Sequence, residues 1–75
     1  LVIEGHTDSD GDTDSNQKLS VRRAETIRRF LIQQYDFITS AMIEARGYGE
    51  ERPVVPNDSA ANKALNRRIE IIVWE

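Results

Sequence analysis

A single long amphipathic pattern constrains the fold of this chain more than any other feature. Over residues 17–34, at about 100° per residue, the apolar side chains fall on one arc of about 140°. The residues on this arc are Leu19, Ala24, Ile27, Phe30 and Leu31. The pattern predicts an α-helix over residues 17–34 that is capped by Ser15 or Asn16 and ends at residues 35–37.

Short apolar segments flank this helix and predict strands. We expect a buried strand at residues 1–5, a second strand at residues 42–48 and a third at residues 69–74. The third segment is apolar enough to be central or well covered in the sheet. Between the second and third strands, Asp58 or Ser59 is expected to cap a short helix that ends near Leu65.

The order of these elements predicts the fold class. A long helix between two strands favours a right-handed crossover and a parallel pair, whereas the last strand could pair in either direction. The prediction is therefore an α/β (α+β) two-layer sandwich in which the helices pack on one mixed sheet. Its element order is strand, helix, strand, short helix, strand.

Composition excludes several classes of protein. The chain has 75 residues, no cysteine and one histidine, so it forms at most one domain and carries neither a disulfide framework nor a Cys/His zinc site. No apolar run approaches the roughly 20 residues of a transmembrane helix. The net charge of −3 disfavours a general nucleic-acid binder, and the basic helix residues Arg22, Arg28 and Arg29 have no aromatic stacking partners among them.

The sequence also lacks catalytic motifs. His6 stands alone and no Gly-x-Ser-x-Gly motif is present, so we predict no enzyme activity, no catalytic residue and no cofactor. We interpret His6 as a strand-end residue whose ring packs or hydrogen-bonds locally.

An acidic loop precedes the helix and raises the hypothesis of a calcium site. Four of the 13 acidic residues lie within seven positions, and these are Asp8, Asp10, Asp12 and Asp14. Calcium prefers several carboxylates at such spacing, but an EF-hand loop that starts at Asp8 needs glycine at Thr13 and glutamate at Leu19. A solvated acidic loop is therefore favoured, we predict no metal site, and calcium remains an alternative.

Arg23 interrupts the apolar side of the helix. It lies four residues after Leu19 and four before Ile27, so it falls within the apolar arc. A buried charge needs a partner. Arg23 is either a structural residue, paired with a loop aspartate or reaching water over an apolar stem, or a pocket residue that holds a carboxylate bidentately.

Four blocks of sequence, in this order, resemble the OmpA-like family, which includes Pal lipoproteins and MotB stator proteins. They are Gly5-His6-Thr7-Asp8 followed by Gly11; Asn16-x-x-Leu19-Ser20-x-x-Arg23-Ala24-x-x-Ile27-x-x-x-Leu31; Arg46-Gly47-Tyr48-Gly49-Glu50 with Pro53 and Asn57; and Asn66-Arg67-Arg68-Ile69-Glu70-Ile71. Ile27 stands where valine is usual.

The resemblance implies non-covalent binding of peptidoglycan through the diaminopimelate of its stem peptide. Asp8 matches the aspartate that pairs with the ligand's ammonium, and Arg23 matches the arginine that holds its carboxylate. Thr7, Asn16 and Arg67 match positions that commonly line the same pocket. Without the resemblance, these three residues are equally well explained as a strand end, a helix cap and a surface ion-pair partner.

The resemblance also implies a larger protein. The family has a strand and a helix upstream of this segment, so residues 1–75 are expected to form an N-terminally incomplete OmpA-like peptidoglycan-binding domain. The expected location is the periplasm, at the outer membrane of a Gram-negative-type bacterium, with a membrane anchor outside these residues. A MotB-like flagellar-stator anchor is the alternative role, and a homodimer stays open.

Overall fold

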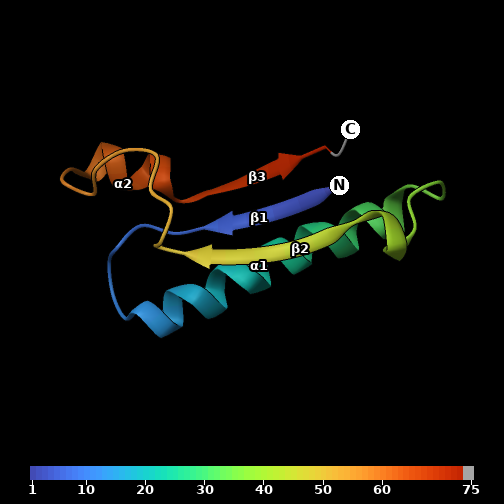
Figure 1. The fold of residues 1–75 in the computed structure, drawn as a ribbon, viewed down its shortest axis with the longest axis horizontal. Coiled ribbons are helices and arrows are strands. Elements are labelled where there is room, and N and C mark those ends of the chain that lie inside the picture. Colours follow the sequence, from blue (N-terminus) through green and yellow to red (C-terminus); the bar gives the residue numbers. More distant parts are fainter. Residues whose placement is uncertain (74–75) are drawn as a thin grey trace.

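The computed structural model describes residues 1–73, which form a two-layer α+β sandwich (Figure 1). The elements in chain order are β1 (Val2–His6), α1 (Thr13–Gln34), the 3-10 turn η1 (Ser40–Met42), β2 (Glu44–Gly49), α2 (Ala60–Asn66) and β3 (Arg68–Ile72). The sheet order is β2-β1-β3, with β1 parallel to β2 and antiparallel to β3. The predicted mixed sheet and parallel pair are thus confirmed. Within the described part of the chain, no helix is long and apolar enough to cross a membrane.

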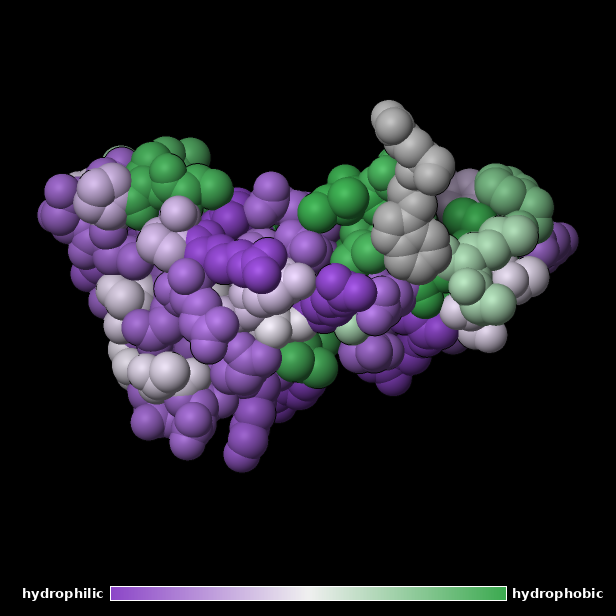
Figure 2. Space-filling model, in the orientation of Figure 1, coloured by the Kyte–Doolittle hydropathy of each residue, from purple (hydrophilic) through white to green (hydrophobic). Residues whose placement is uncertain are grey.

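The third strand is at the edge of this sheet and its end is exposed, so the prediction that it is central or well covered is wrong. β1 is central and buried at all five of its positions, whereas Ile71 and Ile72 of β3 are exposed. An apolar run indicates a strand but does not determine its neighbours, and β1 has hydrogen-bonded partners on both sides. Figure 2 shows hydrophobic areas over α2 and over the far end of β3, separated by a hydrophilic surface. Trp74, the end of the predicted strand, lies outside the described residues.

Both predicted caps of the long helix are wrong, because α1 begins earlier than expected. The Asp12 carboxylate accepts a hydrogen bond from the Ser15 backbone N–H at 2.9 Å and caps the helix. Aspartate is as good an N-cap as serine or asparagine, and Asp14 in the first turn adds favourable charge at the positive end of the helix dipole. The predicted end is confirmed, since Tyr35 is the C-cap residue. The second strand also starts later than predicted, because Met42 belongs to η1.

The buried side of α1 is rotated away from the predicted arc. Its buried residues are Asn16, Ser20 and Ala24. Ile27 and Leu31 pack against the core formed by Ile3, Ala24 and Ile43. Phe30 and Arg23 are exposed, and Leu19 is half-buried. The helix therefore turns a partly polar edge toward the sheet, and Arg23 is exposed, in agreement with the alternative in which its charged end reaches water.

Two glycines explain this rotation. A Cβ at Gly5 would overlap the carbonyl oxygen of Ser20, and a Cβ at Gly47 would lie 2.5 Å from the Ser20 hydroxyl oxygen. Ser20 Oγ in turn accepts a hydrogen bond from the Gly49 N–H at 2.9 Å. The backbone of α1 can therefore lie directly on β1 and β2 only because these strand positions have no side chain.

A buried asparagine fixes the loop between β2 and α2. Asn66 is fully buried, and its Oδ1 accepts from the backbone N–H groups of Val54 (2.9 Å) and Val55 (3.4 Å). Its Nδ2 donates to the Val55 carbonyl at 2.9 Å and to Asn57 Oδ1 at 2.8 Å. The predicted α2 cap Ser59 is confirmed, because its hydroxyl accepts from the Asn62 N–H.

The first prediction concerns the glycine contact. Gly5→Ala should destabilise the fold by about 3 kcal/mol, because a side chain placed against backbone cannot be relieved by a rotamer change. Chemical denaturation measures this loss. Gly11→Ala is the comparison: its Cβ would meet nothing within 4 Å, and only its φ of +83° is unfavourable, so it should cost about 1–2 kcal/mol. Equal stability of Gly5→Ala and wild type would contradict the close approach.

The second prediction concerns Asn66. Asn66→Ala removes four hydrogen bonds from a buried amide and should cost about 1–3 kcal/mol, with faster amide exchange at Val54 and Val55. Asn62→Ala is the matched control, since its side chain makes one exposed hydrogen bond to Asp58, and it should change stability by less than about 0.5 kcal/mol. Unchanged exchange in Asn66→Ala would show that the loop is held by other contacts.

Candidate ligand-binding site

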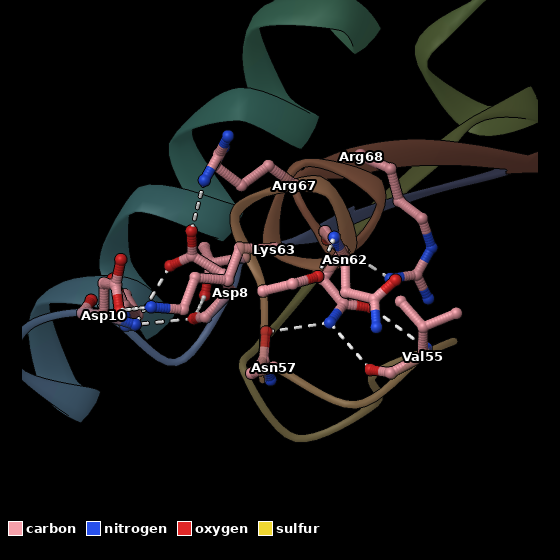
Figure 3. A network of polar contacts seen from close by, with 12 residues as sticks. Asp8, Asp10, Val55, Asn57, Asn62, Lys63, Arg67 and Arg68 are labelled. Atoms are coloured by element: carbon pink, nitrogen blue, oxygen red, sulfur yellow. Dashed lines mark hydrogen bonds and ion pairs between the residues drawn. The ribbon is translucent and has the colours of Figure 1, made fainter.

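Three segments meet at the end of the sheet where β1 finishes: the loop after β1, the start of α1 and the junction of α2 with β3 (Figure 3). Asp8 lies at their meeting point and is only 6% exposed. Its Oδ2 accepts a hydrogen bond from Arg67 Nη1 at 2.5 Å, and its Oδ1 accepts from the Asp10 N–H at 3.0 Å. The hydrogen bond from Arg67, followed by that from Asp10, holds the pKa of Asp8 below its ordinary value. Asp8 is therefore a buried, ionised carboxylate.

Thr7 and Asn16 hold the backbone around this carboxylate. The Thr7 N–H donates to the Gly49 carbonyl at 2.8 Å, and its hydroxyl donates to the Asp8 carbonyl at 2.8 Å. Asn16 Nδ2 lies within hydrogen-bond distance of the carbonyls of Asp10 (2.9 Å) and Asp8 (3.3 Å). Both side chains are buried and already bonded to the protein, so their role is to position the loop.

The other loop aspartates do not converge on a common point. Asp10 forms an ion pair with Lys63 of α2 at 2.9 Å, visible in Figure 3. Asp12 caps α1, and Asp14 lies in its first turn. In residues 1–73, the side chains grouped closely enough to hold a metal ion are Glu4, His6 and Glu70, which are not part of this loop. The geometry therefore does not favour the calcium alternative.

Arg23 lies apart from these four residues, on the exposed surface of α1. It lines a shallow hollow of about 260 Å³ together with Arg22, Thr26, Ile27 and Ile69. Within residues 1–73 its side chain forms neither a hydrogen bond nor an ion pair. Asn16 and Arg23 are two helical turns apart, about 10 Å along the axis. The structure thus brings Thr7, Asp8, Asn16 and Arg67 together and leaves Arg23 on the neighbouring surface.

Sequence analysis missed two residues at this site. Lys63 pairs with Asp10, and Glu50 Oε1 accepts from Asn16 Nδ2 at 3.3 Å. Both contacts join segments more than 30 residues apart, and neither residue type carries a local signal of such a contact.

Comparison with known proteins gives a consistent result. A model of the OmpA family matches residues 1–67. Outer membrane porin F of Pseudomonas aeruginosa is 48% identical over 69 residues, which cover 92% of this chain and 19% of the porin. The crystal structure of the peptidoglycan-associated lipoprotein from Burkholderia pseudomallei superposes with a TM-score of 0.83 at 36% identity, over 92% of this chain and 57% of that one. The C-terminal domain of Helicobacter pylori MotB superposes with a TM-score of 0.81 at 30% identity, over 92% and 52%.

The chain spans about a fifth of the porin and just over half of the two crystallised chains, so it corresponds to a part of each. The family match nevertheless extends over most of the 75 residues and includes the loop after β1, the helix α1 and Arg67, which form the site. This chain therefore belongs to the OmpA family.

Proposed function

We propose that this chain binds peptidoglycan non-covalently through the diaminopimelate of the stem peptide. The observation that carries the proposal is Asp8, an ionised carboxylate buried at the edge of a surface where α1 presents the solvated guanidinium of Arg23. The similarity to a peptidoglycan-associated lipoprotein supports the choice of ligand. The role is one of binding and not of catalysis.

The chemistry of diaminopimelate suits such a pair of charges. Its free end carries an ammonium and a carboxylate on one carbon, so a receptor needs one anion and one bidentate cation. Asp8 attracts the ammonium, and Arg23 holds the carboxylate. Because Arg23 is exposed, the ligand carboxylate replaces water and not an internal partner.

Arg67 has a different role from Arg23. In the free protein it occupies Asp8 Oδ2 and keeps that carboxylate ionised and oriented. Its side chain is 46% exposed, so it can move toward solvent when an ammonium arrives, at small cost. Arg67 therefore keeps Asp8 ionised until the ligand ammonium arrives and then lines the binding site. Thr7 and Asn16 hold the loop in position.

The cellular role follows from the relatives. We place the domain in the periplasm, where it tethers the outer membrane or an envelope complex to the cell wall. Identity to the outer-membrane porin is 48%, against 30% for MotB, which favours a tether. A flagellar-stator anchor is the second candidate, because the MotB domain superposes almost as well as the lipoprotein. Both roles use the same pocket.

The third prediction separates the two charges of the site. Wild type should bind muropeptides with diaminopimelate more tightly than those with lysine, which lacks the second carboxylate. Asp8→Asn should weaken binding of both by about 30-fold or more, because loss of one partner of a desolvated charge pair costs about 2–5 kcal/mol. Arg23→Ala should weaken the diaminopimelate form alone and abolish the preference. Calorimetric titration measures all six affinities.

Arg29→Ala is the matched control for Arg23. Arg29 is exposed on the same helix, and its side chain forms no hydrogen bond or ion pair within residues 1–73. Its removal should therefore change affinity less than about twofold. Arg28 is unsuitable, because it donates to the carbonyls of Ile43 and Ser40 and holds the connector after α1. If Arg23→Ala keeps the preference for diaminopimelate, the assignment of Arg23 is wrong, and if Asp8→Asn binds as wild type, that of Asp8 is wrong.

A further inference from the structure

A second cluster of functional side chains lies on the face of the sheet opposite α1. Ile3 and Gly5 face the helix, so the alternation of β1 turns Glu4 and His6 to the other face. The antiparallel register pairs Glu4 with Glu70 of β3. Figure 2 shows that the surface between the two hydrophobic ends is hydrophilic. This face carries no part of the site around Asp8.

The three side chains converge on one point. His6 Nε2 lies 3.2 Å from Glu70 Oε2 and 3.6 Å from Glu4 Oε1, and one ligand atom of each residue lies within 4.8 Å of the others. His6 is 1% exposed, and within residues 1–73 neither of its ring nitrogens has a hydrogen-bond partner. Glu4 is 8% exposed and also forms no hydrogen bond through its carboxylate in this part of the chain. The buried imidazole of His6 is thus left without a donor or acceptor of good geometry, which is costly.

We propose that Glu4, His6 and Glu70 bind a divalent transition-metal ion such as Zn²⁺. In a tetrahedral site with bonds of about 2.0–2.1 Å, neighbouring ligand atoms are about 3.4 Å apart. The two distances from His6 Nε2 lie on either side of this value. An imidazole with two carboxylates suits zinc, whereas calcium prefers oxygen ligands alone. The Glu70 side chain is 45% exposed, so water can reach a fourth position.

The protonation and orientation of His6 favour this role. Burial, followed by the charge of Arg68, lowers the pKa of His6, which favours the neutral ring, whose nitrogen lone pair can coordinate a metal ion. Tyr48 stacks on the ring with centroids 5.5 Å apart, and the Arg52 guanidinium lies 3.8 Å from the Tyr48 ring centre. The ring is therefore held in one orientation.

Arg68 already contacts one of the proposed ligand oxygens and reduces the negative charge of the site. Its Nε and Nη2 lie 3.0 Å and 2.9 Å from Glu70 Oε2, the oxygen that faces His6. With His6 neutral, Glu4, Glu70 and Arg68 together carry a charge of −1, so a divalent cation is still attracted. When metal binds, the exposed Glu70 carboxylate turns so that Arg68 contacts its other oxygen, as outer-shell partners of ligating carboxylates do. Bound metal then joins β1 to the edge strand β3 and stabilises the fold.

The fourth prediction tests this site with zinc chloride on the purified protein. Wild type should bind one Zn²⁺ in calorimetric titration, with a rise in melting temperature, and the ¹⁵N resonance of His6 Nε2 should shift while that of Nδ1 moves little. Glu70→Gln should weaken zinc binding by about tenfold or more, because loss of even an outer-shell partner of a metal ligand typically costs about 10–100-fold in affinity.

Glu44→Gln is the matched control. Like Glu70, Glu44 of β2 has a side chain that is 45% exposed and paired with an arginine, here Arg46 at 2.8 Å. The Glu44→Gln variant should therefore bind zinc with the affinity of the wild type. Zinc that binds the acidic loop instead would leave the His6 resonances unshifted and would bind Glu70→Gln as tightly as wild type. Either of those results, or no binding at millimolar zinc, would overturn the proposal. Muropeptide binding is measured separately, so failure of this site does not affect that of Asp8.

Discussion

The contact of Ser20 with the glycines of the sheet is the constraint on which the rest of the structure depends. Because Gly5 and Gly47 have no side chains, the backbone of α1 lies directly against β1 and β2 near their carboxyl ends. The first turns of the helix are therefore brought beneath the loop that follows β1. Asn16 can then bond the carbonyls of that loop, and Asp8 is held where the loop, the helix and the start of β3 meet. Without the close approach, these three segments would have no common point.

This arrangement divides the small domain into an apolar part and a polar part. The buried hydrophobic residues of the described chain are Val2, Ile3, Ala24 and Ile43, whereas Asn16, Ser20 and Asn66 are buried polar residues with hydrogen-bond partners. A chain of this length has a marginal apolar core, so polar networks must fix the loops. The same networks keep the loop around Asp8 rigid while the cations near it remain in water. A receptor for a charged ligand benefits from both properties, because a fixed anion costs no ordering when the ligand arrives.

Local sequence signals predicted the elements and missed their mutual placement. The 3.6-residue period identified α1, and the strand–helix–strand order predicted the parallel pair, because both follow from residues close together in sequence. The environment of Arg23 could not be decided from the sequence, since the rotation of α1 depends on glycines in two strands far from it in sequence. The partner of Asp8 was not predictable from the acidic loop for the same reason: Arg67 is 59 residues away. The resemblance to the family supplied the candidate residues of the proposed site but not the Asp8–Arg67 pair, which the fold creates.

Asn66 links the two faces of the sheet, although neither proposed ligand touches it. Arg67 and Arg68 are consecutive, and the strand that begins there sends them to different sides: Arg67 pairs with Asp8, and Arg68 pairs with Glu70. A shift of one residue in the register of β3 would exchange the sides on which the two arginines lie. Neither Asp8 nor Glu70 would then have its arginine partner in the observed geometry. The four hydrogen bonds of the Asn66 amide hold the residue before this pair in one position. The register of an exposed edge strand, and with it the electrostatics of both sites, is thus determined by a buried neutral side chain.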